Sequence, residues 1–228
     1  MTIGDSLVVE HLTVKYADKL ALNDVNLLLA NKGSIVGLFG QNGAGKTTLL
    51  RCIAGVMNRF HGSIRPRGSV VGYLPDQEFI PRRMRIRDVV RACDSLYADF
   101  DGNMATKTIA ELDLSLDARV STVSRGMSEQ LHLSMILARR CGLYVLDEPL
   151  AAVDPLTRDK LLMMIKNYRK PGSTVVISTH LIGGLEGLFD EAIMIHQGKL
   201  ILHDAVSAVL SQGGLEQRFK EVISAATS

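Results

Sequence analysis

Residues 40–47, GQNGAGKT, constrain this chain more than any other segment. The apolar run before them, residues 34–39 (SIVGLF), is typical of a buried strand, and residues 48–54 (TLLRCIA) are typical of a helix. Glycine-rich backbone between a strand and a helix can close its amides around an anion, which the positive end of the helix also attracts. The segment therefore predicts an α/β fold with a phosphate-binding loop.

The loop fits the pattern G-x-x-x-x-G-K-[ST], in which the lysine reaches the β and γ phosphates of a nucleotide and the hydroxyl binds magnesium. We assign these roles to Lys46 and Thr47, and we expect a nucleoside triphosphate with Mg2+ as the ligand. The residues predicted to bind the nucleotide at this loop are Gly40, Gln41, Asn42, Gly43, Ala44, Gly45, Lys46, Thr47 and Thr48.

Two adjacent carboxylates follow another apolar run, residues 143–146 (LYVL). Asp147 ends this predicted strand beside the phosphate loop, where it can hold magnesium directly or through water. Glu148 comes next and can orient or deprotonate the water that attacks the γ phosphate. Two acids on a solvated turn are the alternative interpretation, which the phosphate loop disfavours. The pair indicates hydrolysis rather than phosphoryl transfer to a second substrate.

The composition is that of a globular protein whose charge excludes little. With 228 residues, 46% of them hydrophobic, the chain can form one α/β domain with a subdomain or two small domains. The net charge of +2 points neither toward nor away from a polyanionic partner. Cys52, Cys93 and Cys141 have no C-x-x-C spacing and are expected to be reduced core residues, which favours the cytoplasm. The sequence begins without a basic signal-peptide region and contains no apolar stretch of about 18 residues, so we expect neither secretion nor a membrane span.

Hydrophobic periodicity divides the chain into strands and helices. Alternation over residues 6–37 predicts antiparallel strands that lead into the loop strand, and a further strand is expected over 69–74. Helical spacing over 86–97, 104–112 and 131–138 predicts an inserted helical region. Buried strands are expected at 143–146 and 174–178, and a terminal helix at 215–223. Asp154 and Pro155 form a helix start, with the aspartate as N-cap.

With these motifs, the chain resembles the nucleotide-binding subunit of an ATP-binding cassette (ABC) transporter over nearly its whole length. Residues 123–127 (VSRGM) resemble the family signature LSGGQ but keep only its serine and second glycine, Ser124 and Gly126. Residues 151–154 (AAVD) resemble the loop that couples two subunits. Residues 178–180 (STH) resemble the segment whose histidine contacts the γ phosphate, and Tyr16 lies where the family stacks an aromatic ring on adenine.

The resemblance implies an α/β fold with a P-loop NTPase core, an antiparallel β subdomain and an inserted helical subdomain. It implies a single ABC ATPase domain over residues 1–228, in which 1–78 and 141–228 form the core lobe and 79–140 form the helical lobe with the signature. It further implies ATP and Mg2+ as cofactors, with Lys46, Glu148 and His180 as the catalytic residues.

Ser124 and Gly126 are expected to bind nucleotide across a dimer. A serine hydroxyl, a glycine that admits close approach and a helix beginning near Ser128 would together face a phosphate held by the other subunit. Arg125 is open to two interpretations, a solvated side chain or an added charge toward the phosphate.

Asp76 departs from the family pattern, which has glutamine at this position. Its carboxylate can still serve magnesium through a bound water, so the expected metal residues are Thr47, Asp147 and Asp76. If the loop is shifted by one residue, Gln77 takes this role and Asp76 is a solvated turn acid.

A cluster of five arginines is expected on the exposed side of the helix that bears Ile86 and Val90; its members are Arg82, Arg83, Arg85, Arg87 and Arg91. The cluster is either a solvated face or a partner contact, because the resemblance puts the docking groove for a membrane subunit between the helical lobe and the core. Aromatic residues do not interleave with the arginines, so no nucleic acid is expected as a partner.

The sequence thus predicts an ATPase that dimerises head to tail, as a homodimer or heterodimer, and powers separately encoded integral membrane permease subunits. It would be cytoplasmic and bound through the permease to the inner face of the cell membrane. Its length and altered signature resemble the cassettes of small bacterial exporters, including those for antibiotics, peptides or lipophilic compounds. The alternative is a soluble ABC ATPase acting on a protein assembly or nucleic acid. A regulatory module without hydrolysis is disfavoured because Glu148 and His180 are both present.

Overall fold

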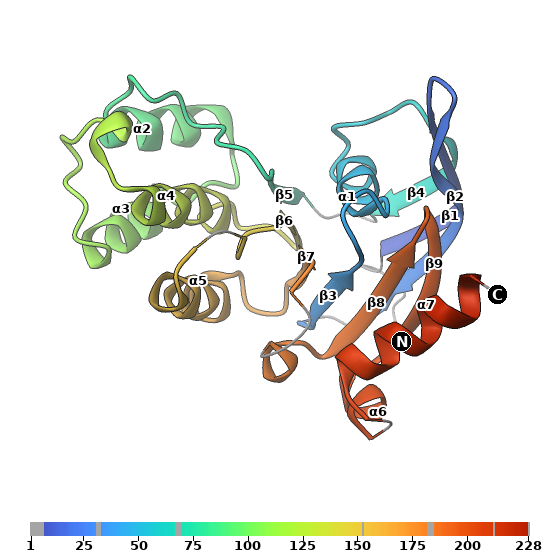
Figure 1. Ribbon diagram of the computed structural model, residues 1–228. Coiled ribbons are helices and arrows are strands. Elements are labelled where there is room, and N and C mark those ends of the chain that lie inside the picture. Colours follow the sequence, from blue (N-terminus) through green and yellow to red (C-terminus); the bar gives the residue numbers. More distant parts are fainter. Residues whose placement is uncertain are drawn as a thin grey trace.

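Two β-sheets and a group of helices make up the described part of the chain (Figure 1). The computed structural model describes residues 7–30, 33–66, 70–151, 153–181, 185–211 and 213–227. Predictions that fall on residues 6, 31–32 and 69 and on Ala152 lie outside the described residues. Figure 1 shows helices α2, α3 and α4 on one side of the molecule and the sheets with α1 and α7 on the other.

The larger sheet carries the segments that the sequence associates with nucleotide chemistry. Its six strands run in the order β5 (Val71–Leu74), β6 (Leu143–Asp147), β7 (Thr174–Thr179), β3 (Ile35–Phe39), β8 (Glu191–His196) and β9 (Lys199–Ala205). Neighbouring strands are parallel except for β9, which is antiparallel to β8. β3 and β6 are buried along their whole length, as expected for apolar strands covered on both faces. Because parallel strands end at the same edge, the loops after β3, β6 and β7 meet there.

The smaller sheet confirms the antiparallel strands expected near the start of the chain. β1 (Leu7–Tyr16) pairs with β2 (Lys19–Leu29) and with β4 (His61–Pro66), both antiparallel. The apolar positions of β1 and β2 alternate between buried and more exposed, as the sequence pattern predicts. The sequence did not predict β4, because HGSIRP has no apolar alternation.

Seven α-helices are described, and most lie where the periodicity places them. They are α1 (Lys46–Ile53), α2 (Ile86–Leu96), α3 (Gly102–Glu111), α4 (Arg125–Leu137), α5 (Pro155–Tyr168), α6 (Val206–Leu210) and α7 (Leu215–Thr227). The Asp154 side chain accepts a hydrogen bond from the Thr157 N–H, which confirms the predicted N-cap. The expectation that the signature helix begins near Ser128 is wrong. α4 begins at Arg125 because the Ser124 hydroxyl accepts from the Met127 N–H and caps it.

Three clusters of buried side chains fill the interior. Two of them pack the sheets against α1, α4, α5 and the last helices, and the third lies within residues 80–138. The expectation of three core cysteines is wrong for Cys93, which is half-buried on α2. Burial raises the pKa of Cys52 to about 11 and that of Cys141 to about 12. No helix in the described part of the chain is both long and apolar enough to cross a membrane.

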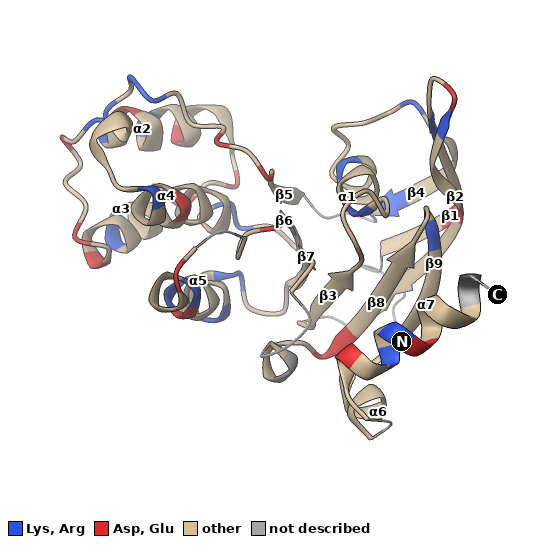
Figure 2. Cartoon of the chain, viewed as in Figure 1, with Lys and Arg blue, Asp and Glu red and all other residues tan. Residues whose placement is uncertain are grey.

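Only two of the five clustered arginines, Arg87 and Arg91, lie on α2, and the other three precede it (Figure 2). The expectation that all five share one helix face is therefore wrong. Arg85 donates to the Asp117 carbonyl oxygen at 2.6 Å, and Arg87 forms an ion pair with the Asp117 carboxylate. These two side chains hold the segment after α3 against the start of α2, so they have a structural role within the chain.

Candidate functional site

The loop between β3 and α1 has the backbone that a phosphate-binding loop requires. Gly45 caps α1 with a φ of 115°, a region that favours glycine. A Cβ atom there would lie 2.7 Å from the Ala21 carbonyl oxygen, so any larger residue would collide with β2. The first amides of α1 thus open toward the loop and give it the positive end of a helix.

A cavity of about 310 Å³ lies against this loop. It is lined by most of the residues predicted to bind nucleotide, namely Tyr16, Gln41, Asn42, Gly43, Gly45, Lys46, Thr47 and Thr48, together with the predicted metal residue Asp76 and the predicted catalytic residue Glu148. The Tyr16 ring is partly exposed, and its hydroxyl lies 3.5 Å from the Met57 sulfur. The cavity therefore gathers the loop, one aromatic ring and two carboxylates from four separate parts of the chain.

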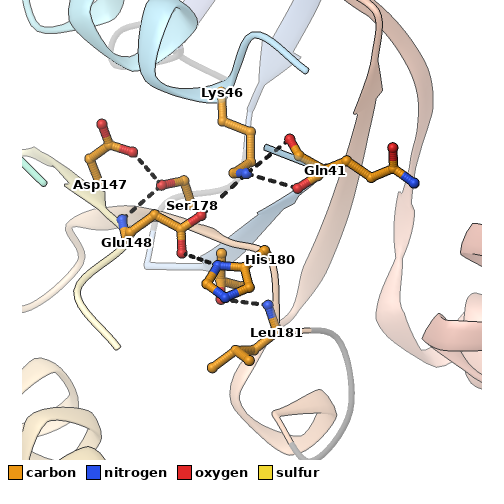
Figure 3. A network of polar contacts seen from close by, with 9 residues as sticks. Gln41, Lys46, Asp147, Glu148, Ser178, His180 and Leu181 are labelled. Atoms are coloured by element: carbon orange, nitrogen blue, oxygen red, sulfur yellow. Dashed lines mark hydrogen bonds and ion pairs between the residues drawn. The ribbon is translucent and has the colours of Figure 1, made fainter. Parts of the chain in front are cut away.

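Lys46 connects the phosphate loop to the Glu148 carboxylate (Figure 3). Its buried ammonium group donates to the Gly40 carbonyl oxygen at 2.8 Å and to that of Gln41 at 3.4 Å. The same Nζ lies 3.2 Å from Glu148 Oε1, while Glu148 Oε2 lies 2.9 Å from His180 Nδ1. Glu148 is therefore held between a lysine and a histidine, which fixes the direction of its carboxylate.

The Glu148 backbone adopts a left-handed conformation with a φ of 50°, which costs on the order of 1–3 kcal/mol for a residue other than glycine. Two contacts hold it there. The Glu148 N–H donates to the Ser178 hydroxyl at 2.8 Å, and the Ala151 N–H donates to the Glu148 carbonyl oxygen at 3.1 Å. This conformation turns the Glu148 side chain toward Lys46 and His180.

Asp147 has the properties of a magnesium ligand. Its side chain is 1% exposed, and its Oδ1 accepts from the Ser178 hydroxyl at 2.6 Å. Its Oδ2 is buried and has no hydrogen-bond partner among the described residues. Burial raises the pKa of Asp147, and interactions with Ser178 and Thr47 partly oppose that rise. A buried carboxylate oxygen without a partner, close to a threonine hydroxyl, fits a hard cation that takes one or two protein ligands.

The described residues contain no group of three or more histidine, cysteine, aspartate or glutamate side chains placed to hold a metal ion. The Mg2+ prediction therefore rests on Thr47 and Asp147.

His180 follows the end of β7 and borders a second cavity of about 570 Å³. Because a carboxylate can only accept, the His180 Nδ1 that faces Glu148 carries the proton. Gln41 lines both this cavity and the loop cavity. The histidine thus stands between the phosphate loop and α7, which supplies Phe219 and Lys220 to the second cavity.

Asp76, rather than Gln77, lies at the loop cavity. The residues that line the cavity include Asp76 and not Gln77. Asp76 Oδ1 lies 3.5 Å from the Arg51 guanidinium on α1, so this arginine holds the carboxylate beside the loop. Sequence reasoning missed Arg51, whose place in α1 gave no sign of a partner after β5.

Ser124 and Gly126 are not brought to the loop of their own chain. Neither lines the cavity among the residues described there, and both lie at the start of α4. A Cβ atom at Gly126 would lie 3.1 Å from Thr157 Oγ1 at the start of α5. Gly126 therefore allows two helix N-termini of one chain to approach closely, a packing role that the sequence did not reveal.

Ser178 is the main residue of the site to which sequence reasoning gave no role of its own. Its hydroxyl donates to the Asp147 carboxylate and accepts from the Glu148 N–H, so it joins the Asp147 side chain to the Glu148 backbone. The sequence shows that Ser178 belongs to the STH segment. It does not show that Ser178 contacts a residue on the neighbouring parallel strand.

Comparison with known proteins shows which family the sequence of this chain matches. A family model described as "ABC transporter" matches residues 22–151, more than half of the 228-residue chain. The lipopolysaccharide export system ATP-binding protein LptB of Escherichia coli (strain K12) is 29% identical over 225 residues, covering 90% of this chain and 92% of LptB. The lantibiotic transport ATP-binding protein SrtF of Streptococcus pyogenes is 27% identical over 206 residues, covering 86% of this chain and 89% of SrtF.

A solved structure supports the fold separately. The ATP-binding subunit of an ABC transporter superposes with a TM-score of 0.84 and 22% sequence identity, covering 95% of this chain and 99% of that one. The arrangement of sheets and helices is therefore that of an ABC ATPase domain.

Proposed function

Because this chain belongs to the ABC transporter family and is an ATP-binding ATPase subunit, we propose that it powers export through a separately encoded membrane permease. One observation carries the catalytic part of the proposal: the Glu148 carboxylate is held between Lys46 and His180, and the Ser178 hydroxyl joins the Glu148 N–H to the buried Asp147 carboxylate. The exporter assignment is supported by the similarity to LptB and SrtF, whose names refer to lipopolysaccharide export and lantibiotic transport.

Each residue of the network has a distinct task in hydrolysis. Thr47 and Asp147 would hold Mg2+, which when bound neutralises charge on the phosphates of ATP. Lys46 binds the β and γ phosphates of ATP through its ammonium group. Glu148 orients the attacking water and, as a general base, accepts a proton from it. His180, whose Nδ1 lies 2.9 Å from Glu148 Oε2, keeps the Glu148 carboxylate directed at the water, and we assign its contact with the γ phosphate to the same side chain.

The second half of each ATP site comes from another copy of the family's subunit. Ser124 caps α4, so its hydroxyl and the first amides of α4 form a positive helix end with an exposed residue at its tip. Such an end binds phosphate from outside the chain. We assign Ser124 and Gly126 to the ATP held by the partner subunit's loop, and Tyr16 to the adenine of their own chain's ATP.

A mixing experiment tests this shared site. Ser124→Arg places a long charged side chain at the interface and should abolish ATP-dependent dimerisation, whereas Lys46→Ala should prevent it at an ATP concentration too low to fill the weakened site. A mixture of the two chains, both also carrying Glu148→Gln, contains one intact site per dimer, so tagged Lys46→Ala should capture untagged Ser124→Arg only when ATP is present. Equal capture with and without ATP, or none in either case, would argue against a site built from two chains.

An apolar groove offers the permease a docking surface. It has a volume of about 510 Å³ and lies between the end of β5 and the helices of residues 80–138. Leu96 projects from it with 74% of its surface exposed, and the Arg139 guanidinium covers the Tyr97 ring at 3.9 Å. Other partly exposed apolar side chains in the groove are Val56, Tyr73, Phe79 and Met84. We propose that a short intracellular segment of the permease packs here with its apolar side chains.

Leu96→Glu should reduce the amount of the chain that co-purifies with its permease by about tenfold or more, because the charge would be buried in an apolar contact. The measurement is quantitative recovery of tagged chain and permease from detergent-solubilised membranes. Met163→Glu is the matched control, since Met163 is also exposed, at 65%, but lies on α5 away from the groove. Equal recovery of the two variants would remove the groove from the proposal.

A further inference from the structure

A buried histidine on the signature helix makes contacts that hydrolysis does not require. His132 lies on α4, about two turns after Ser124, and only 2% of its surface is exposed. A buried imidazole needs partners for both ring nitrogens, so its contacts show what it holds in place.

The closest partner of each ring nitrogen is a backbone group, and the Ser128 hydroxyl lies farther from Nδ1, at 3.4 Å. His132 Nδ1 lies 2.6 Å from the Ser128 carbonyl oxygen on the preceding turn of α4. His132 Nε2 accepts from the Ile80 N–H at 3.3 Å. A carbonyl only accepts and an N–H only donates, so these partners assign a neutral ring with its proton on Nδ1.

The segment before Ile80 makes two more contacts with the same turn of α4. The Phe79 ring meets the His132 ring edge to face, with centroids 4.8 Å apart. The Ser128 hydroxyl lies 3.5 Å from Glu78 Oε1. Three consecutive residues, 78–80, therefore lie against one turn of α4, and His132 makes the one hydrogen bond to their backbone among the described contacts.

The ring thus joins two parts of the ATP site that are far apart in the chain. Segment 76–80 starts with Asp76 at the loop cavity, and its Phe79 lines the permease groove. α4 starts with Ser124, which serves the partner subunit's ATP under the proposed function.

We propose that His132 is a positioning residue that fixes segment 76–80 to α4, so that Asp76 and Ser124 move as one body when two subunits close on ATP. The inference rests on the proposed function, since it needs a dimer that closes on ATP. Without the ring, the Ile80 N–H loses its partner and segment 76–80 can move away from α4. The segment must then return to α4 before two subunits can close on ATP.

Two amides of different length separate positioning from simple packing. His132→Asn can still donate to the Ser128 carbonyl oxygen but is too short to reach Ile80. His132→Gln is longer by one carbon and can accept from the Ile80 N–H. In the Glu148→Gln background, we expect Asn and Ala to raise the ATP concentration for half-maximal dimerisation about five- to tenfold, and Gln to stay near the parent.

The test uses light scattering for dimerisation and a nucleotide titration at low protein concentration for ATP binding to the monomer. ATP affinity of the monomer should be unchanged in all three His132 variants, because the phosphate loop is untouched. The control is His203→Asn, which replaces a histidine on β9 that is paired with Glu191. This variant should dimerise at the same ATP concentration as the parent.

Three outcomes would overturn the proposal. In the first, the Asn and Gln variants dimerise at the same ATP concentration. In the second, the Asn and Ala variants dimerise as the parent does. In the third, the ATP affinity of the monomer falls in the Asn and Ala variants, which would assign His132 a purely structural role. If the Glu148→Gln parent itself fails to dimerise with ATP, the proposed function has failed instead, so the two failures are distinguishable.

Discussion

Glu148→Gln will lower the kcat of ATP hydrolysis by the assembled transporter by about 10²- to 10⁴-fold, the range for loss of a residue that activates water. Glutamine has nearly the same shape but cannot take up a proton at neutral pH. ATP affinity should be retained, because Lys46 keeps its bonds to the loop carbonyls without Glu148. Phosphate release from the purified complex and a nucleotide titration measure the two quantities.

The matched control is Glu221→Gln, which removes an exposed carboxylate on α7 and should leave kcat unchanged. Hydrolysis by Glu148→Gln at the wild-type rate would contradict the role of this carboxylate. Loss of ATP affinity in the same variant would instead mean that Glu148 serves binding through its contact with Lys46.

Lys46→Ala will weaken ATP binding by about 10- to 100-fold, because a charged hydrogen bond to the phosphates is lost. The buried ammonium group also neutralises Glu148 at 3.2 Å, so its removal places an unpaired carboxylate near the phosphates of ATP. Both effects act in the same direction. Equilibrium titration of the isolated chain with a fluorescent ATP analogue measures the loss.

Lys107→Ala is the control for this variant, since Lys107 is an exposed lysine on α3 whose described ion pair is with Glu111. Its ATP affinity should equal that of the parent chain. An unchanged ATP affinity in Lys46→Ala would show that the phosphates of ATP bind elsewhere. It would contradict the assignment of residues 40–47 as the phosphate-binding loop.

The parts of the site that lie at strand ends could be predicted from the sequence. The apolar runs before Gly40, Asp147 and His180 are buried parallel strands, and parallel strands bring their carboxyl ends together at one edge. The positions of these residues therefore follow from local patterns alone. The predicted cap at Asp154 was confirmed for the same reason, because a cap depends on neighbouring residues.

Contacts between distant segments could not be predicted in this way. Ser178 bonds Asp147 from a neighbouring strand, Arg51 lies beside Asp76, and His132 meets Ile80 from another element. Each depends on how folded elements face one another, which no periodicity records. β8 and β9 were also missed, although their apolar runs, residues 192–195 (AIMI) and 200–202 (LIL), flank a turn at Gly198.

The start of α4 shows how local rules can mislead by one turn. The apolar positions used to place the helix begin at Leu131, but Ser124 caps it before the apolar pattern starts. The cap determines which amides are free, so the earlier start puts Arg125 and Gly126 in the first turn.

Light scattering of the Glu148→Gln chain with and without MgATP tests the central claim most directly, that two copies share ATP between the phosphate loop of one and Ser124 of the other. The monomer mass is 24.9 kDa. The account predicts that saturating MgATP doubles the measured mass, that removing MgATP restores the monomer, and that adding Ser124→Arg to the same chain prevents the doubling. A mass that stays at the monomer value with saturating MgATP, or a dimer that Ser124→Arg leaves intact, would contradict it.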